Sequence, residues 1–394
     1  MASFPWDTQP DAEINTPAIN TQSSNPEKID RAMMQRCIQL ARLGWGKTAP
    51  NPLVGAVVVN KEGKIIGEGF HPQAGQPHAE IFALREAGEL ARGATIYVNL
   101  EPCNHYGRTP PCSEALVQAG VARVVVGMVD PNPLVAGGGI QRLQQAGIEV
   151  VVGVEEAACR KLNEAFIHRI LYKRPFGIYK YAMTLDGKIA TSTGHSNWVS
   201  GEEARNEVHH LRVGCDAVIV GGNTVISDNP LLTNHHTDTH NPLRVVMSRS
   251  LNLPENAHLW DTSEVPTLVF TEPNAAPDFQ RMLEKKAVAV VQLEPLTPAK
   301  VMEYLYNQQM LTVLWECGGK LAARAIAEGS VQKIWAFIAP KIVGGVNAPS
   351  PVGDLGLVNM TEALNLERVS WRSIGADYLV EGYLPLPEPS RFNH

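Results

Sequence analysis

Apolar residues recur along this chain with two alternating periods. Short runs of β-branched and apolar residues, such as 95–100, predict strands, whereas apolar residues three and four apart, as over 79–92, predict helices. Asn25-Pro26-Glu27 has the N-cap, proline and first-turn acid of a helix start, and this first helix ends at Gly44. Further helices are predicted at 79–92, 112–119, 138–146 and 155–172, and strands at 53–60, 64–70, 95–100, 122–128 and 148–152. This alternation predicts an α/β/α layered sheet.

A second set of elements follows Lys173-Arg174-Pro175, where we place a domain boundary. The pattern predicts helices at 201–213 and 321–327, strands at 176–183, 216–220, 243–247, 267–270, 311–315 and 331–338, and a closing hairpin at 366–385. We therefore expect a poorly ordered N-terminal extension over 1–27, one α/β domain over 28–173 and a second over 174–386.

Composition narrows the class of protein. The chain has 394 residues, of which 44% are hydrophobic and 19% charged, as expected for a globular protein of two domains. Its net charge of −6 argues against a nucleic-acid surface, which is usually basic. The first 25 residues lack the basic and apolar regions of a signal peptide, and no apolar run reaches the length of a membrane span.

The six cysteines are not spaced as a disulfide framework. We expect Cys37, Cys159 and Cys215, which fall in or beside apolar patterns, to be reduced and packed in the core. The reduced thiols favour a cytoplasmic protein.

Candidate chemistry is concentrated in His78-Ala79-Glu80, Cys103 and Cys112. One imidazole and two thiolates suit Zn²⁺ and leave a fourth position open for water. Glu80 is not expected to be a ligand, and it is placed to carry protons. A lone His-x-Glu is usually a solvated helix face, but here His78 opens a predicted helix, Cys103 follows a predicted strand and Cys112 starts another helix, so the three can converge. Zinc nucleobase deaminases divide the work in this way.

The two cysteines are separated by eight residues instead of the usual two. Residues 102–112 read Pro-Cys-Asn-His-Tyr-Gly-Arg-Thr-Pro-Pro-Cys. This run resembles the bifunctional riboflavin-biosynthesis deaminase/reductase family, as do the stretches 50–55, 69–71 and 130–137. The resemblance covers all but about the first 27 residues.

The resemblance implies a cytidine-deaminase-like α/β/α domain followed by a dihydrofolate-reductase-like α/β domain. It implies a zinc-dependent hydrolase that deaminates 2,5-diamino-6-ribosylamino-4(3H)-pyrimidinone 5′-phosphate. An NADPH-dependent oxidoreductase activity then reduces the ribosyl group, giving 5-amino-6-ribitylaminouracil 5′-phosphate. We expect Glu80 to be catalytic and His78, Cys103 and Cys112 to bind the metal. Our candidates for contacts with the pyrimidine substrate are Asn51, His71, His105, Arg108 and Asn132.

The second candidate site contains Glu316-Cys317-Gly318-Gly319-Lys320, where a strand meets a helix. Bare backbone N–H groups at a helix start suit a phosphate, although a glycine pair is more often plain turn chemistry. The resemblance implies that NADP contacts Met183, Trp198, Thr224, Asp228, Gly318, Gly319, Lys320, Leu321, Ala322, Ala323 and Arg324. It also implies that the reductase substrate contacts Lys180, Ser196, Arg212, Leu232 and Glu316.

Two positions depart from the family pattern. His235 stands where an arginine usually binds the substrate phosphate, and we predict that it has inherited this contact. Arg205 or Arg249 remains an alternative phosphate ligand. Ser248-Arg249 stands where Asp-Ser is usual, which leaves the cofactor contact there open. We interpret the histidines between 235 and 240 as part of a polar loop and Cys317 as a packing residue.

Two other functions remain possible from the residues alone. A nucleic-acid deaminase with an accessory domain is disfavoured by the acidic charge and by the second domain. A catalytically silent nucleotide-binding module is disfavoured by the intact Glu80 and both cysteines. We expect a small phosphorylated pyrimidine as the substrate, no nucleic-acid or membrane partner, and a homo-oligomer.

Overall fold

The computed structural model describes residues 25–106, 110–235 and 240–385. These residues form two compact units, which meet in the chain between Leu171 and Tyr172. We call them the N-terminal unit and the C-terminal unit. The N-terminal extension predicted over 1–27 lies outside the described residues up to residue 24, and Asn25 caps the first helix as predicted, accepting a hydrogen bond from the backbone N–H of Glu27.

The N-terminal unit is built on a five-stranded sheet in the order β2-β1-β3-β4-β5. The strand β1 pairs antiparallel with β2 and β3, whereas β3, β4 and β5 are parallel. The strands are β1 (Gly55–Val59), β2 (Ile65–Phe70), β3 (Thr95–Val98), β4 (Arg123–Val126) and β5 (Glu149–Val152).

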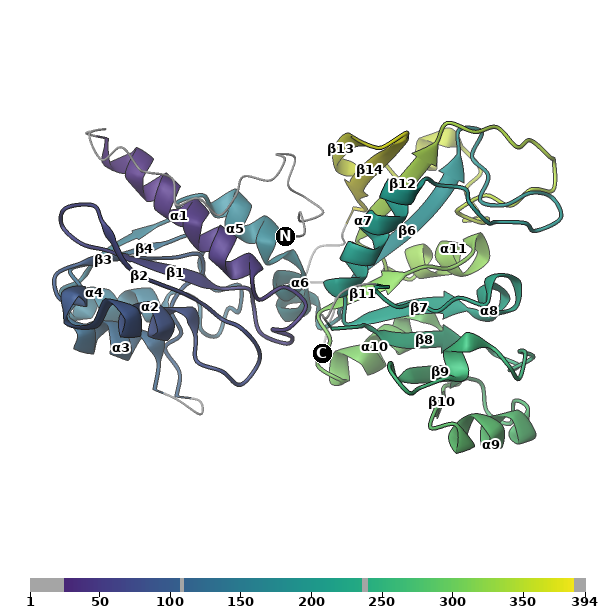
Figure 1. The fold of residues 1–394 in the computed structure, drawn as a ribbon, viewed down its shortest axis with the longest axis horizontal. Coiled ribbons are helices and arrows are strands. Elements are labelled where there is room, and N and C mark those ends of the chain that lie inside the picture. Colours follow the sequence, from purple (N-terminus) through teal and green to yellow (C-terminus); the bar gives the residue numbers. More distant parts are fainter. Residues whose placement is uncertain (1–24, 107–109, 236–239, 386–394) are drawn as a thin grey trace. The chain divides into compact units, whose positions relative to one another are not determined.

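Helices cover both faces of this sheet. Figure 1 shows α1 and α5 on one face and α2, α3 and α4 on the other. The helices are α1 (Pro26–Arg42), α2 (Ala79–Ala87), α3 (Cys112–Ala119), α4 (Gly138–Gln145), α5 (Glu156–Leu162) and α6 (Glu164–Tyr172), and a 3₁₀ turn, η1 (Gly88–Ala91), extends α2. The layered sheet expected from the alternating pattern is present.

Glycine lets the first turn of α2 approach β2 closely. A Cβ on Gly69 would lie 2.4 Å from the carbonyl oxygen of Ala79 and 2.6 Å from the backbone nitrogen of Ala83. Only a residue without a side chain permits this contact. The start of α2, which carries His78 and Glu80, is therefore held directly against the sheet.

The single helix predicted over 155–172 is wrong, because the structure has α5 and α6 with a break at Asn163. The buried Asn163 side chain accepts the N–H of Leu53 and donates to the Leu53 carbonyl oxygen. The amide of asparagine has both an acceptor and a donor, so it can pair with both polar groups of one backbone residue. The apolar period continues across the break, which is why the sequence pattern did not reveal it.

The C-terminal unit is built on a nine-stranded sheet in the order β10-β9-β8-β7-β11-β6-β12-β14-β13. The seven strands from β10 to β12 are parallel, and β14 and β13 add an antiparallel edge. The strands are β6 (Phe176–Thr184), β7 (Ala217–Gly221), β8 (Leu243–Met247), β9 (Thr267–Thr271), β10 (Ala289–Gln292), β11 (Thr312–Trp315), β12 (Lys333–Ala339), β13 (Glu367–Ile374) and β14 (Asp377–Tyr383).

Helices connect the parallel strands of this unit (Figure 1). They are α7 (Glu202–Val213), α8 (Gly222–Asp228), α9 (Pro277–Lys285), α10 (Pro298–Asn307) and α11 (Gly319–Ala327), with 3₁₀ turns η2 (His258–Trp260) and η3 (Met360–Glu362). The elements α8, α9, β10 and α10 were not predicted. The sequence does carry a signal for α10, since Thr297 caps it by accepting the N–H of Lys300 and Pro298 occupies its first turn.

The place of β11 in the sheet of the C-terminal unit creates a position where a ligand can bind. The strand β11 inserts between β6 and β7, so the chain leaves the strand ends there in opposite directions. Open parallel sheets bind ligands at such switch points, beyond the carboxyl ends of the strands. The core beneath contains the fully buried Trp260, Trp315 and Trp335. Among the described residues, no helix is long and apolar enough to cross a membrane.

Candidate active sites

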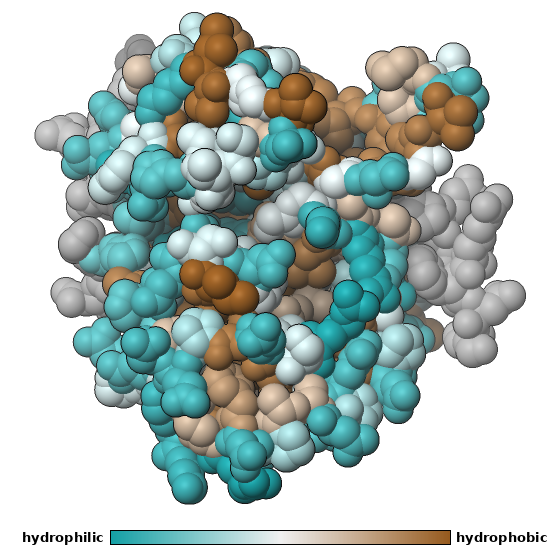
Figure 2. All heavy atoms as spheres, turned by 90° about the vertical axis from the view of Figure 1, so that its right-hand side faces the viewer, coloured by the Kyte–Doolittle hydropathy of each residue, from teal (hydrophilic) through white to brown (hydrophobic). Residues whose placement is uncertain are grey.

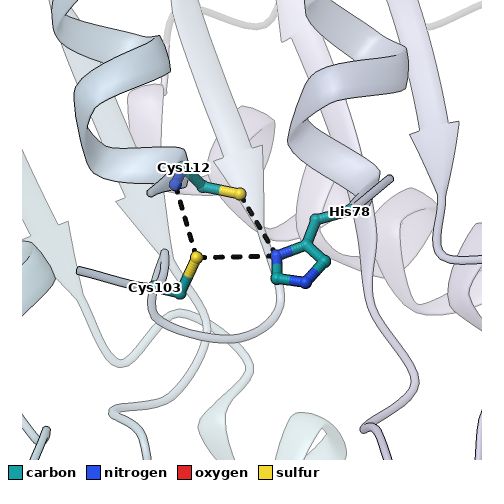
Figure 3. Close-up of side chains that lie close together, drawn as sticks. All are labelled: His78, Cys103 and Cys112. Carbon is teal, nitrogen blue, oxygen red and sulfur yellow. Dashed lines mark hydrogen bonds between the residues drawn. The ribbon is translucent and has the colours of Figure 1, made fainter. Parts of the chain in front are cut away.

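Three predicted metal ligands meet in the N-terminal unit. His78 is the N-cap of α2, Cys103 lies in the loop after β3, and Cys112 is the first residue of α3. The His78 Nδ1 atom lies 3.5 Å from the Cys103 sulfur and 3.3 Å from the Cys112 sulfur. Figure 3 shows the three side chains pointing toward one another from these separate segments.

The spacing of these atoms fits zinc. Zinc binds sulfur at about 2.3 Å and imidazole nitrogen at about 2.0–2.1 Å, so a tetrahedral site separates nitrogen from sulfur by about 3.6 Å. The measured separations of 3.5 and 3.3 Å are close to this value. Among the described residues, this is the one group of three His, Cys, Asp or Glu side chains with ligand atoms within 4.8 Å of one another. Three protein ligands leave the fourth position for water, as in catalytic zinc sites.

Glu80 lies in the first turn of α2 beside the ligands and is 3% exposed. Its Oε2 atom is buried without a hydrogen-bond partner among the described residues. Burial raises the pKa of this carboxyl group, and the charge of His78 opposes that effect. A buried, unpaired carboxyl oxygen is costly, and it is expected where a bound water or substrate supplies the partner.

A cavity of about 250 Å³ opens beside the ligands. Four of the five candidates for contacts with the pyrimidine line it, namely Asn51, His71, His105 and Asn132. The fifth, Arg108, lies outside the described residues. The full lining is Asn51, Pro52, Val54, His71, His78, Glu80, Leu100, Glu101, Cys103, His105, Asp130, Asn132, Val135, Phe166 and Ile170.

His71 and Asn51 orient each other within this cavity. The Nδ1 of His71 lies 3.1 Å from the carbonyl oxygen of Pro77, so this nitrogen carries the proton and donates. The Nε2 atom then accepts from the Asn51 amide nitrogen at 3.0 Å. Burial lowers the pKa of His71, which favours the same neutral imidazole. The carbonyl oxygen of the Asn51 amide remains as an acceptor for a ligand.

Sequence reasoning missed Glu101, a buried residue in the wall of the cavity. One carboxylate oxygen accepts the N–H groups of Asp130 and Gly137, and the other accepts those of Gly139 and Ile140, at 2.9–3.2 Å. Glu101 thereby fixes the segment that carries Asn132 to the segment that carries Cys103. Its place within Leu-Glu-Pro-Cys was a signal, but only the fold reveals the four donors.

Asp130 was missed as well. It lines the cavity, and burial raises the pKa of its carboxyl group. The side chains of Phe166 and Ile170, one turn apart on α6, supply an apolar part of the wall. Their spacing indicated a buried helix face but not what that face would line.

In the C-terminal unit, the predicted substrate residues Lys180, Arg212 and Glu316 come together. Trp315 of β11 pairs with Tyr179 of β6, so the next residue, Glu316, lies level with Lys180. The Arg212 guanidinium of α7 binds both oxygens of Glu316 at 2.7 and 3.0 Å, and the Lys180 ammonium lies 3.9 Å from one of them. Burial alone would raise the pKa of Glu316, but Arg212 and Lys180 outweigh it and lower the pKa to about 2.

Most hydrogen-bond donors of the Arg212 guanidinium bind other groups of the protein. A third donor of Arg212 binds the carbonyl oxygen of Thr233 at 2.7 Å, and the residue is 8% exposed. Of five guanidinium N–H groups, three are therefore used.

His235 lies with its ring centroid 4.6 Å from that of His209, which sequence reasoning missed. Leu232 is buried with a positive φ, so its side chain belongs to the core.

The predicted cofactor residues lie around the strand ends. A Cβ on Gly318 would meet nothing within 4 Å, so the backbone there is open. Leu321 and Ala322 donate their N–H groups to the Gly318 carbonyl oxygen. Among the described residues, the N–H groups of Gly319 and Lys320 have no such acceptor, which suits a phosphate at the start of α11. Ala322 and Ala323 are buried, and Arg324 pairs with Glu328.

The other predicted cofactor residues are more exposed. Trp198 is 69% exposed with a φ of 67°, and the Arg205 guanidinium lies 4.3 Å from its ring centroid. The Ser196 hydroxyl donates to the Asp228 carboxylate at 2.7 Å, which joins a substrate candidate to a cofactor candidate. Thr224 lies in α8 and Met183 near the end of β6.

Comparison with known proteins assigns both units. Residues 27–128 match the cytidine and deoxycytidylate deaminase zinc-binding region. Residues 175–380 match the RibD C-terminal domain, and this second match alone covers more than half of the chain. The chain belongs to the RibD family of riboflavin-biosynthesis proteins. It is 64% identical to RibD of Synechocystis over 90% of this chain and 96% of that protein, and 43% identical to RibD of Aquifex aeolicus over 90% and 98%.

Solved structures agree with this family. A RibD structure from Acinetobacter baumannii superposes with a TM-score of 0.82 at 39% identity, covering 91% of this chain and all of that one. A deaminase/reductase from Thermotoga maritima gives a TM-score of 0.81 at 35% identity, covering 92% of this chain and all of that one. The predicted fold class is confirmed, and the chain is a bifunctional deaminase and reductase of riboflavin biosynthesis that uses zinc and NADPH.

Proposed function

We propose that the cavity beside His78, Cys103 and Cys112 removes the 2-amino group of the diaminopyrimidine, with Glu80 as the proton carrier. Zinc held by these three side chains would lower the pKa of a water molecule in the fourth position. Glu80 takes a proton from that water as a C–O bond forms, and gives a proton to the amine as the C–N bond breaks and ammonia leaves. The buried, unpaired Oε2 of Glu80 is the observation that carries this role.

The remaining polar residues of the cavity position the substrate. Asn51, held by His71, offers a carbonyl oxygen to a ring or amino N–H of the pyrimidine. We assign the ribosyl phosphate end to His105 and Arg108, from the chain segment after β3, and to Asn132, from the segment after β4. The apolar wall from Phe166 and Ile170 supports the flat faces of the ring.

In the C-terminal unit, we infer that Lys180 and Glu316 handle the opened sugar during reduction. When bound, NADPH would supply the hydride for C1′ of the sugar. Lys180, desolvated and held by Glu316, is placed to protonate or orient the sugar, and burial lowers the pKa of its ammonium. Arg212 keeps Glu316 ionised. The two remaining N–H donors of Arg212 bind the substrate phosphate, together with the ring of His235. Ser196 and Leu232 complete the proposed substrate contacts, the latter through its backbone.

The NADPH assignment uses the switch point of the nine-stranded sheet. We assign the pyrophosphate to Gly318, where the backbone is open, and to the N–H groups of Gly319 and Lys320 at the start of α11. Leu321, Ala322, Ala323 and Arg324 belong to the same helix start, and Met183, Trp198, Thr224 and Asp228 are assigned to the rest of the cofactor.

We also propose a boundary between the catalytic domains at residues 173–174 and a homo-oligomer in solution. The large exposed apolar side chains of the C-terminal unit support a second copy as partner. Figure 2, which faces this unit, shows brown side chains among the teal, most clearly toward its upper edge. The large apolar and aromatic side chains that are at least half exposed after residue 340 are Ile342, Val346, Val358, Met360, Trp371 and Tyr378. We expect the protein in the cytoplasm, with no nucleic-acid or membrane partner.

The products of the zinc-loaded enzyme test this function. Without NADPH, the diaminopyrimidine should lose its amino group to an oxygen and release one ammonia. With NADPH, the product mass should rise further by two hydrogens. Ammonia released from tRNA but not from the free pyrimidine would favour the nucleic-acid deaminase instead.

A further inference from the structure

The strand β8 ends beside the proposed cofactor site, and the next two residues are Ser248 and Arg249. Gly221 at the end of β7 pairs with Met247, and β7 pairs on its other side with β11. Because these strands are parallel, Arg249 and the Gly318 turn lie at the same edge of the sheet, two strand spacings apart. That separation is about 10 Å.

The backbone of Arg249 is fixed while its side chain is exposed. The N–H of Ser248 donates to the Phe270 carbonyl oxygen at 3.0 Å. The carbonyl oxygen of Arg249 accepts the Thr271 hydroxyl at 3.0 Å and the N–H of Glu272 at 3.4 Å. Within the described ranges, the Arg249 guanidinium forms no ion pair with a carboxylate within 4.0 Å. A cation is thus presented to solvent from a rigid strand end.

Ser248 connects this cation to the start of α8. A Cβ on Gly222 would lie 3.2 Å from the Ser248 hydroxyl oxygen, so the hydroxyl faces the glycine turn that follows β7. Glu272, an acidic residue after the adjacent β9, accepts the N–H of Leu296 at 3.3 Å, which commits one of its oxygens to a neighbouring loop. A hydroxyl and a guanidinium therefore stand at this edge without a carboxylate paired to them.

We propose that Arg249, assisted by the Ser248 hydroxyl, binds the 2′-phosphate of NADPH and makes the reductase prefer NADPH to NADH. In dinucleotide-binding sheets, the residue after a neighbouring strand meets the adenosine ribose, where a carboxylate suits a 2′-hydroxyl and an arginine suits a 2′-phosphate. A guanidinium donates two parallel hydrogen bonds to a phosphate. The inference rests on the cofactor site proposed above, with the pyrophosphate at Gly318 and Gly319.

The sheet order separates this role from that of the substrate phosphate. Lys180 and Glu316 belong to β6 and the end of β11, whereas Arg249 follows β8 on the far side of β7. The pyrophosphate of the cofactor is assigned to the Gly318 turn, at the end of β11. If the nicotinamide end lies toward Lys180 on β6, the adenosine end extends the other way, over the ends of β7 and β8. This arrangement assigns Arg249 to the cofactor and leaves the substrate phosphate to His235 and Arg212.

Calorimetric titration of the full-length protein with two fragments tests the proposal without turnover. Wild-type protein should bind adenosine 2′,5′-bisphosphate more tightly than AMP. Arg249→Ser should reduce that preference about 10- to 100-fold, the range for losing hydrogen bonds to a charged group, and leave the affinity for AMP unchanged. Arg249→Lys should keep part of the preference. Arg281→Ser, which removes an exposed arginine from α9, is the matched control and should have no effect.

Steady-state kinetics with the deaminated substrate give a second readout. The KM for NADPH should rise in Arg249→Ser, while the KM for NADH stays constant. An Arg249→Ser protein that retains the wild-type preference would overturn the assignment of Arg249 while NADPH-dependent turnover persists. A wild-type protein that binds neither NADPH nor the bisphosphate would overturn the cofactor site itself.

Discussion

The metal site of the N-terminal unit and the charged site of the C-terminal unit are assembled from the chain in different ways. The first takes its three ligands from residues 78 to 112, at two helix starts and one loop. The second brings together Lys180, Arg212 and Glu316, which only the order of strands β7, β11 and β6 makes neighbours. A metal site built from nearby segments leaves a motif in the sequence, whereas a site built from strand order does not.

The two sites also satisfy their buried charges differently. In the N-terminal unit, Glu80 keeps an oxygen without a partner among the described residues. In the C-terminal unit, both oxygens of Glu316 are bound by Arg212. Glu80 is therefore available for proton transfer, while Glu316 acts as a fixed negative charge that holds Lys180.

Loss of a metal ligand should give the largest contrast between the two units. Cys103→Ser should lose zinc and reduce ammonia release to background, because the remaining two ligands bind zinc weakly. NADPH oxidation with the deaminated intermediate should continue. Zinc content and both rates would be measured on one preparation. Cys37→Ser, a buried cysteine of the same unit that is not a ligand, is the control. Loss of both activities in a folded Cys103→Ser protein would contradict separate sites.

Glu80→Gln tests proton transfer alone. We expect stoichiometric zinc and a deamination rate reduced about 10²- to 10⁴-fold, the usual effect of removing a general acid–base group. Glu86→Gln, on the exposed part of the same helix, should behave as wild type. Near wild-type ammonia release from zinc-loaded Glu80→Gln protein would remove Glu80 from the mechanism.

Arg212→Met should destabilise the C-terminal unit by about 3–5 kcal/mol at neutral pH, because it leaves the Glu316 charge buried without its partner. The pKa of Glu316 is lowered from its ordinary 4.5 to about 2, so the stability that this pair supplies is complete above about pH 4.5. It is lost as the pH falls toward about 2, and the difference between variant and wild type should narrow over that range. Urea unfolding followed by tryptophan fluorescence would measure it.

A double variant sharpens the same prediction. Adding Glu316→Gln to Arg212→Met should recover part of the lost stability, since no buried charge then lacks a partner. A constant difference from pH 7 to pH 3, or no recovery in the double variant, would show that Arg212 acts by packing alone.

Glu101→Gln should have the smallest effect on deamination of the variants in the N-terminal unit. An amide can accept only through its oxygen, so two of the four backbone N–H groups bound by Glu101 lose their acceptor, at about 1–3 kcal/mol for each buried group. The deaminase KM should rise more than kcat falls, because the displaced segment carries Asn132 and no proton-transfer group. Glu149→Gln, on the exposed edge strand β5, should leave the KM unchanged. An altered NADPH oxidation rate in Glu101→Gln would argue against a local role.

Sequence patterns were informative where a side chain's role depends on its neighbours in the chain. They located the starts of α1 and α3, the strand β8 and the ligands His78, Cys103 and Cys112, because capping, period and motif are local. They did not locate the break at Asn163 or the four donors of Glu101, since both depend on residues far away in the chain. The His209 ring beside His235 was missed for the same reason.

Removal of zinc from the wild-type enzyme tests most directly that two independent sites share this chain. The protein would be stripped with a chelator and assayed for ammonia release and for NADPH oxidation with the deaminated intermediate, before and after zinc is restored. The account predicts that ammonia release falls to background and returns with stoichiometric zinc, while the NADPH oxidation rate stays constant. Ammonia release that survives zinc removal, or NADPH oxidation that falls with it, would contradict the account.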